Sequence, residues 1–123
     1  MRALIIDDSR AMRRMLTAFV SASTGAEMLA ACNGLEALGC LEEHMPVDLA
    51  LVDWDMPEMS GIEFVRAVRA DARYDAVKLL MVTGRNDEDA LSEALTEGAD
   101  DFLMKPLDEE MIVDKLRILG FGE

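Results

Sequence analysis

The sequence predicts an α/β fold, a doubly wound parallel sheet of five strands covered by five helices. Five short apolar runs rich in β-forming residues begin between 23 and 29 residues apart along the 123-residue chain. A hairpin would need only a few residues between strands, whereas a parallel crossover needs a dozen or more. Runs that are almost wholly apolar are typical of a parallel sheet buried on both faces. The expected strands are Ala3–Ile6, Ala26–Ala31, Leu49–Val52, Lys78–Val82 and Phe102–Met104.

Each segment that follows one of these runs repeats apolar residues with the period of a helix. Ser9 is the predicted N-cap of the first helix, an Asn33-Gly34 turn precedes the second, and Gly98 ends the fourth. In chain order the apolar stripes are Met12, Met15, Leu16, Phe19 and Val20; Leu35, Leu38 and Leu41; Ile62, Val65 and Val68; Leu91, Ala94 and Leu95; and Ile112, Leu116 and Leu119. The remaining residues leave about four for each connection, which is an ordinary loop length.

The composition favours one acidic globular domain spanning residues 1–123. Lys and Arg number 12 and Asp and Glu number 25, which gives a net charge of −13. Nucleic acids and anionic membrane surfaces attract proteins through cations, so neither is an expected partner. The N-terminal apolar run is short and ends in Asp7 and Asp8, unlike a secretion signal, and we therefore expect a cytoplasmic protein.

A few other side chains can be interpreted from their sequence context. Cys32 and Cys40 are too few for a metal knuckle or a disulfide framework, and we expect free thiols that pack like small buried hydrophobes. Trp54 is expected to be partly exposed. Asp100 and Asp101 are expected to be solvated loop charges.

Polar side chains gather directly after the predicted strands. Asp7 and Asp8 follow the first strand, Asp53 and Asp55 follow the third, and the later strands end in Thr83-Gly84 and Lys105-Pro106. Open α/β sheets bind ligands beyond the carboxyl ends of their strands. In a flavodoxin-like strand order 2-1-3-4-5 the first and third strands are neighbours. We therefore expect the aspartates Asp7, Asp8 and Asp53 to converge on one small volume.

Three converging carboxylates require a counter-charge. Two unit charges 4 Å apart repel by about 4 kcal/mol at an effective dielectric near 20. A few hard oxygen ligands suit Mg²⁺, with Mn²⁺ as the alternative. The Thr83 hydroxyl and the Lys105 ammonium supply a hydrogen-bond donor and a positive charge, which is what a bound phosphoryl group requires. The sequence thus predicts a Mg²⁺-dependent phosphoryl site with a carboxylate acceptor.

The residues around this site resemble a known family over nearly the whole chain. The matching segments are Ile5-Ile6-Asp7-Asp8-Ser9 followed by Met12-Arg13-Arg14, then Asn33-Gly34-Leu35-Glu36-Ala37, Asp48–Gly61, Met81-Val82-Thr83-Gly84 and Gly98–Pro106. Together and in this order they resemble the receiver domain of two-component response regulators, of the stand-alone CheY-like type. The resemblance implies a single receiver domain with no output domain of its own.

The resemblance also implies a role for each carboxylate. Asp53 would be the phosphoacceptor, taking the group from a sensor histidine kinase, a phosphotransfer protein or a small phosphodonor. Asp8 and Asp53 would bind Mg²⁺ directly, the main-chain carbonyl of Asp55 would be a third ligand, and Asp7 would act through water. Catalysis would be limited to the phosphorylation and dephosphorylation of Asp53, so the chain is not expected to be an enzyme.

The remaining matched positions imply a conformational switch. Lys105 would pair with the acyl phosphate, and the family usually has a cis peptide bond between the residues at Lys105 and Pro106. Thr83 would hydrogen-bond a phosphoryl oxygen, and the Phe102 ring would turn inward into the space that Thr83 leaves. The responding surface would comprise the fourth helix, fifth strand and fifth helix, roughly Asp87–Gly98 and Asp101–Leu119. It would control an unidentified partner protein.

Asp55 and Arg85 occupy positions at which this family varies. We interpret them as an ion pair across the site that tunes hydrolysis of the acyl phosphate by hindering water. The alternative is two solvated charges, worth under about 1 kcal/mol as a pair.

Other functions and assemblies stay open from the sequence. The chain could be a phosphorelay intermediate that passes the group from Asp53 to a histidine of another protein. The Asp53-Trp54-Asp55 run also resembles haloacid-dehalogenase-like phosphatases, although Pro57 stands where they have Thr or Val. A monomer is expected, with a dimer through the fourth helix, fifth strand and fifth helix as the alternative.

Overall fold

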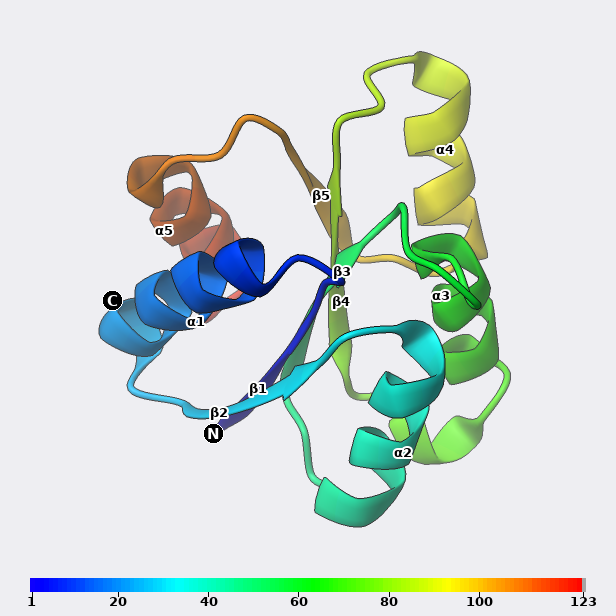
Figure 1. Ribbon diagram of the computed structural model, residues 1–123, viewed down its shortest axis with the longest axis horizontal. Coiled ribbons are helices and arrows are strands. Elements are labelled where there is room, and N and C mark those ends of the chain that lie inside the picture. Colours follow the sequence, from blue (N-terminus) through cyan, green and yellow to red (C-terminus); the bar gives the residue numbers. More distant parts are fainter. Residues whose placement is uncertain (123) are drawn as a thin grey trace.

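The computed structural model describes residues 1–122, in which strands alternate with α-helices (Figure 1). Every strand begins and ends within one residue of its predicted bounds. The elements are β1 (Arg2–Ile6), α1 (Arg10–Thr24), β2 (Glu27–Ala31), α2 (Gly34–His44), β3 (Leu49–Asp53), α3 (Gly61–Arg69), the 3₁₀ helix η1 (Ala72–Tyr74), β4 (Lys78–Thr83), α4 (Glu88–Glu97), β5 (Asp101–Met104) and α5 (Glu109–Ile118). The η1 turn is the one element among these that the sequence patterns did not predict.

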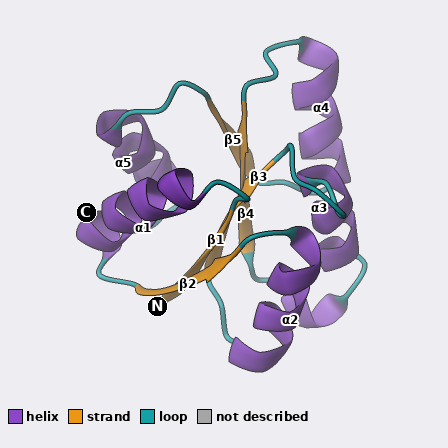
Figure 2. Ribbon diagram, in the orientation of Figure 1, coloured by secondary structure: helices purple, strands orange, loops and turns teal. Residues whose placement is uncertain are grey.

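The sheet is parallel throughout and has the order β2-β1-β3-β4-β5, which confirms the predicted fold class. Figure 2 shows the sheet between two helical layers, with α1 and α5 on one face and α2, α3 and α4 on the other. Because β1 lies between β2 and β3, the chain reverses its direction of winding at β1. The crevice at such a reversal lies between the carboxyl ends of β1 and β3, which is where ligands bind in open α/β sheets.

Alternate residues of the strands feed two separate cores. On the α2–α4 face, Leu4, Val52 and Met81 are buried against Phe64 and Val65 of α3. The residues Ile5, Leu51 and Val82 point to the other face, where they meet Leu16, Val20, Ile112 and Leu116 of α1 and α5. Burying each such side chain contributes about 1.5–3 kcal/mol. No helix within residues 1–122 is long and apolar enough to cross a lipid bilayer.

Helix ends are fixed by side chains that the sequence places at the caps. The predicted cap Ser9 accepts a hydrogen bond from the backbone N–H of Met12, and Ser60 forms a reciprocal capping box with Glu63. Helix α1 ends at Gly25 in the left-handed region, with φ of 70°. The two N-caps, Ser9 and Ser60, lie in the β1–α1 and β3–α3 loops, at the edge of the sheet where the polar residues gather.

Two interpretations of single residues were wrong or partly wrong. Asp100 lies exposed in the α4–β5 loop as expected, but its carboxylate binds Arg69 and accepts the backbone N–H of Leu79. Asp101 is not a loop residue, because it belongs to β5. Cys32 and Cys40 are free thiols as expected, but both are only partly buried.

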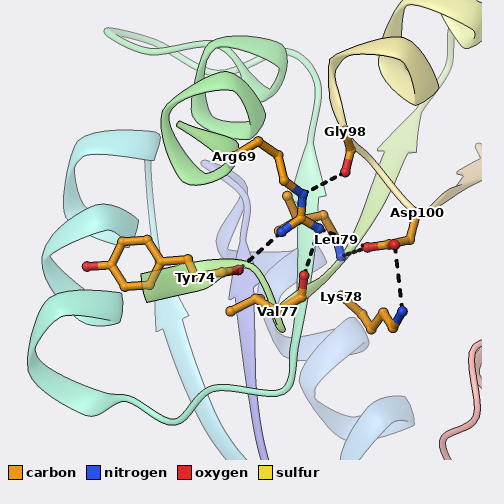
Figure 3. A network of polar contacts seen from close by, with 7 residues as sticks. All are labelled: Arg69, Tyr74, Val77, Lys78, Leu79, Gly98 and Asp100. Carbon is orange, nitrogen blue, oxygen red and sulfur yellow. Dashed lines mark hydrogen bonds and ion pairs between the residues drawn. The ribbon is translucent and has the colours of Figure 1, made fainter. Parts of the chain in front are cut away.

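Arg69, the last residue of α3, joins four segments of the chain (Figure 3). Its guanidinium donates to the main-chain oxygens of Gly98 (2.9 Å), Tyr74 (3.1 Å) and Val77 (2.7 Å), and to Asp100 Oδ2 at 3.0 Å. The side chain is 20% exposed, so these bonds are mostly shielded from water. The network ties the α3 end, η1, the start of β4 and the α4–β5 loop together.

Candidate functional site

The three predicted aspartates meet at the carboxyl ends of β1 and β3. Asp53 is the last residue of β3, and Asp7 and Asp8 directly follow β1. Each of the three residues offers one carboxylate oxygen, and these oxygens all lie within 4.8 Å of one another. The side chains converge because parallel neighbouring strands end at the same edge, with Ile6 in register with Val52.

Two of these carboxylates are buried, and one oxygen has no partner. Asp7 is 1% exposed and Asp53 is 4% exposed, whereas Asp8 is exposed. Asp7 Oδ1 accepts a hydrogen bond from the Ser9 N–H at 2.8 Å, but Asp7 Oδ2 is a buried atom without a hydrogen-bond partner. Burial raises the pKa of the Asp7 carboxyl, because removal from water disfavours the charged form, and the nearby Asp53 raises it further. A buried orphan oxygen among three carboxylates indicates a place for a cation.

These donors fit a small divalent cation. Carboxylate oxygens of two strand ends, one of them exposed, match the hard oxygen ligands and retained waters that Mg²⁺ prefers. The Asp55 carbonyl lies in the loop that follows Asp53. No softer ligand lies in the described cluster, which favours Mg²⁺ or Mn²⁺ over Zn²⁺.

Lys105, the residue after β5, places a positive charge beside the cluster of aspartates. Its Nζ lies 3.1 Å from Asp53 Oδ1. Burial raises the pKa of the Asp53 carboxyl, and the Lys105 ammonium partly opposes that rise. The Lys105 N–H donates to the Thr83 carbonyl at 2.8 Å, and the Lys105–Pro106 peptide bond is cis. The Lys105 ammonium thus lies within hydrogen-bond distance of the Asp53 carboxylate.

Thr83, at the end of β4, is buried and directed toward the loop that follows it. The residue is 1% exposed, and its Oγ1 accepts a hydrogen bond from the Arg85 N–H at 2.9 Å. This hydrogen bond holds the hydroxyl to the β4–α4 loop, so Thr83 Oγ1 must give it up in order to turn away from that loop.

Arg85 binds two residues of the loop that follows Asp53. Its Nη2 lies 3.1 Å from Asp55 Oδ1, so the expected ion pair is present, with 48% of the Arg85 side chain and 70% of the Asp55 side chain exposed. The guanidinium also lies 5.2 Å from the centroid of the Trp54 ring. Trp54 was expected to be partly exposed, which is wrong: only 6% of it is exposed, because the ring packs into the α2–α4 core under Arg85.

Two residues that shape the site were not assigned a role from the sequence. Arg13 Nη1 donates to the Asp7 carbonyl at 2.8 Å and so holds the β1–α1 loop. A Cβ at Gly61 would lie 2.3 Å from the Asp53 carbonyl, so only glycine lets α3 begin this close to the acceptor strand. Both residues can be seen in the sequence, Arg13 as a cation one turn into α1 and Gly61 as a glycine after the acidic residues that follow β3. The sequence alone does not show which backbone group either residue contacts.

Replacement of Asp7 by asparagine should stabilise the metal-free protein by about 1–3 kcal/mol. The pKa of Asp7 is raised in the folded state. The stability that this carboxyl contributes is therefore full below its unfolded pKa, and it is lost as the pH rises through the folded pKa. Above the folded pKa the protein carries the penalty of a buried charge at Asp7, which a neutral amide removes.

Urea unfolding in EDTA at neutral pH measures this effect. Asp75→Asn, which changes an exposed carboxylate after η1, is the matched control and should alter the free energy of unfolding by less than about 0.5 kcal/mol. Saturating Mg²⁺ should raise the stability of the unaltered chain more than that of Asp7→Asn. A lower free energy of unfolding for Asp7→Asn than for the unaltered chain in EDTA would show that the buried Asp7 charge does not destabilise the fold.

Both the sequence and the structure of the chain are similar to those of known proteins. Residues 3–117 match the family model described as response regulator receiver domain. A chemotaxis protein CheY homolog of Campylobacter jejuni is 33% identical over 123 residues, with 99% of this chain and 95% of the relative covered. Chemotaxis protein CheY1 of Helicobacter pylori strain J99 is 31% identical, with 97% and 96% covered. The solved structure of the chemotaxis response regulator CheY4 of Vibrio cholerae is 31% identical, covers 96% of this chain and 97% of its own, and has a TM-score of 0.89.

Proposed function

The chain belongs to the response regulator receiver domain family, and we propose that it is a signalling switch in which Asp53 is the phosphoacceptor. Receiver domains of this type act in two-component systems as phosphorylation-activated switches and not as turnover enzymes. One observation carries the choice of Asp53. It is a buried carboxylate that shares one small volume with two other carboxylates and lies 3.1 Å from an ammonium.

The proposed chemistry is a transfer to the Asp53 carboxylate. An Asp53 oxygen attacks the phosphorus of the donor, the bond from phosphorus to the donor's leaving atom breaks, and an acyl phosphate forms on Asp53. Lys105 and Thr83 bind oxygens of the transferred group. Asp8, Asp53 and the Asp55 carbonyl would hold Mg²⁺ or Mn²⁺, with Asp7 acting through water. The cation supplies charge neutralisation between the attacking carboxylate and the incoming phosphoryl oxygens.

The response that we propose begins at Thr83 and ends at Phe102. When Thr83 Oγ1 turns to the phosphoryl group it gives up its bond to the Arg85 N–H, and the half-buried Phe102 ring on β5 turns into the space that is freed. Burying a Phe side chain supplies about 1.5–3 kcal/mol, whereas a shift from 1:99 to 99:1 requires about 5.5 kcal/mol. The bonds from Thr83 and Lys105 to the phosphoryl group must supply the remainder.

The proposed partners follow from this scheme. A sensor histidine kinase or a phosphotransfer protein is the phosphodonor, and an unidentified protein binds the face formed by α4, β5 and α5. In the proposed switch, residues 1–123 act as one cytoplasmic receiver domain, the protein is a monomer, and the output comes from the partner. A dimer through α4, β5 and α5 is the alternative assembly, and a phosphorelay step to another protein's histidine is the alternative role.

The proposal is tested by intact-mass measurement with acetyl phosphate. With Mg²⁺ the protein should gain the mass of one phosphoryl group and release acetate, and with EDTA it should gain none. A phosphatase related to the haloacid dehalogenases would instead hydrolyse a generic phosphomonoester over many turnovers. Absence of an adduct in Mg²⁺, or adducts at several sites, would contradict the proposal.

Removal of the Arg85 side chain should shorten the life of the acyl phosphate. Arg85 is paired with Asp55 and covers Trp54 beside the pocket, so Arg85→Ala opens a path for water to the phosphoryl group. We expect dephosphorylation to accelerate by about two- to five-fold, since an exposed pair and a cation–π contact are each worth under about 1 kcal/mol. Decay of the mass adduct after removal of the donor measures the rate.

Arg73→Ala, which removes another arginine with an ion pair and a cation–π contact, is the control. Equal rates for Arg85→Ala and the unaltered chain would show that the pair does not hinder water.

A further inference from the structure

Phe102 is held by two charged residues that the proposed switch does not use. The Lys115 ammonium on α5 lies 5.7 Å from the centroid of the Phe102 ring. The same ammonium is 3.1 Å from Asp101 Oδ1, and that carboxylate also accepts a hydrogen bond from the Phe102 N–H at 2.8 Å. We call these three residues, Asp101, Phe102 and Lys115, the β5–α5 clasp.

The clasp is better shielded than an ordinary surface pair. The side chains of Lys115 and Asp101 are each 23% exposed, whereas the Arg117 and Asp114 side chains on the same helix are about 60% exposed. Water and salt screen a half-buried pair less than an exposed one. The ion pair therefore fixes the flexible lysine stem, and the fixed ammonium remains over the ring face, where the quadrupole of the ring attracts it.

We infer that Lys115 is a positioning residue that holds the Phe102 ring in its half-buried position beside α5 and so opposes activation. The inference rests on the proposed function, in which the ring turns inward when Asp53 is phosphorylated. An inward ring would separate from the ammonium, because Lys115 approaches from α5 and remains bound to Asp101. A contact that exists in only one of two states shifts the equilibrium toward that state. Lys115 thus sets the threshold of the switch without contact with the acceptor site.

The direction in which a Lys115 substitution changes anion affinity distinguishes this role from a general charge effect. In Lys115→Met the stem keeps its length and apolar contacts while the charge is lost. Loss of the clasp should favour the inward state and tighten binding of beryllofluoride, an anion that mimics a phosphoryl group on a carboxylate. Loss of a cation from a chain with net charge −13 should by itself weaken the binding of an anion.

The measurement is a titration with beryllofluoride in saturating Mg²⁺, followed by the fluorescence of Trp54, the one tryptophan of the chain and the neighbour of Asp53. We expect Lys115→Met to lower the apparent Kd about two- to five-fold, which is the size of a partly exposed cation–π contact. Lys115→Arg keeps both the ion pair and the contact with the ring, and it should return the Kd to that of the unaltered chain.

Two controls make the result specific. Arg117→Met removes a positive charge from the side of α5 that lies against α1, and it should leave the Kd unchanged or raise it. In a Phe102→Ala background Lys115→Met should no longer tighten binding, because no ring remains to be held. A normal beryllofluoride response that Lys115→Met leaves unchanged or weakens would overturn the clasp alone. No response from the unaltered chain would overturn the proposed function, and the clasp with it.

Discussion

Asparagine at position 53 should abolish the phosphoryl adduct completely in the intact-mass assay. The Asp53 carboxylate is the attacking group, and a neutral amide oxygen of the same size is a far weaker nucleophile. Lys105 would lose its ion pair with Asp53 but stay in the pocket, so any residual uptake would report another acceptor. We expect uptake from acetyl phosphate to fall at least about 100-fold, to below detection.

The matched control is Asp55→Asn. Asp55 lies two residues further along the same loop, its side chain is 70% exposed, and its proposed contribution to the metal site is a main-chain carbonyl that the substitution preserves. The Asp55→Asn protein should therefore still take up one phosphoryl group. An adduct that persists in Asp53→Asn and disappears in Asp55→Asn would move the acceptor to the second carboxylate and refute the proposed assignment.

The sequence predicted the sheet and the meeting of the aspartates for the same reason. Apolar runs at crossover spacing define parallel strands, and parallel strands end at a common edge, so residues that directly follow them must converge. Asp7 and Asp53 are therefore placed by topology, and no detail of side-chain packing is needed. Their convergence could be predicted from one chain because it depends only on strand order.

The features that the sequence did not predict depend on contacts between distant loops. Trp54 looks like an exposed loop residue in the sequence, and its burial depends on how the β3–α3 loop folds back and on Arg85, which lies 31 positions later. Asp100 and Asp101 look like a pair of solvated acids, yet one binds Arg69 and the other binds Lys115. A charged side chain gives the same local pattern whether it meets water or a partner from another element, so these contacts require the tertiary structure.

Arg69 is the residue whose loss should destabilise the fold most among the charged side chains considered above. Arg69→Met keeps a long apolar stem but removes the guanidinium donors from the carbonyls of Gly98, Tyr74 and Val77. Of these three carbonyls, that of Tyr74 still accepts the N–H of Val77. Buried acceptors left without partners cost about 1–3 kcal/mol each before water or the backbone rearranges to meet them. We expect the free energy of unfolding to fall by about 3 kcal/mol, measured by urea denaturation at neutral pH.

Arg66→Met separates this network from an ordinary surface ion pair. Arg66 is one turn earlier on α3, pairs with Glu93 and Glu97 of α4, and is 48% exposed, so its loss should cost under about 1 kcal/mol. Asp100→Asn should fall between the two, because an amide oxygen can still accept the N–H of Leu79 while the charge that faces Arg69 is lost. If Arg69→Met and Arg66→Met cost the same, water must satisfy the carbonyls of Gly98 and Val77. In that case the Arg69 bonds would add little to stability, and the α4–β5 loop would be held by its hydrogen bonds to Leu79 and by its apolar contacts.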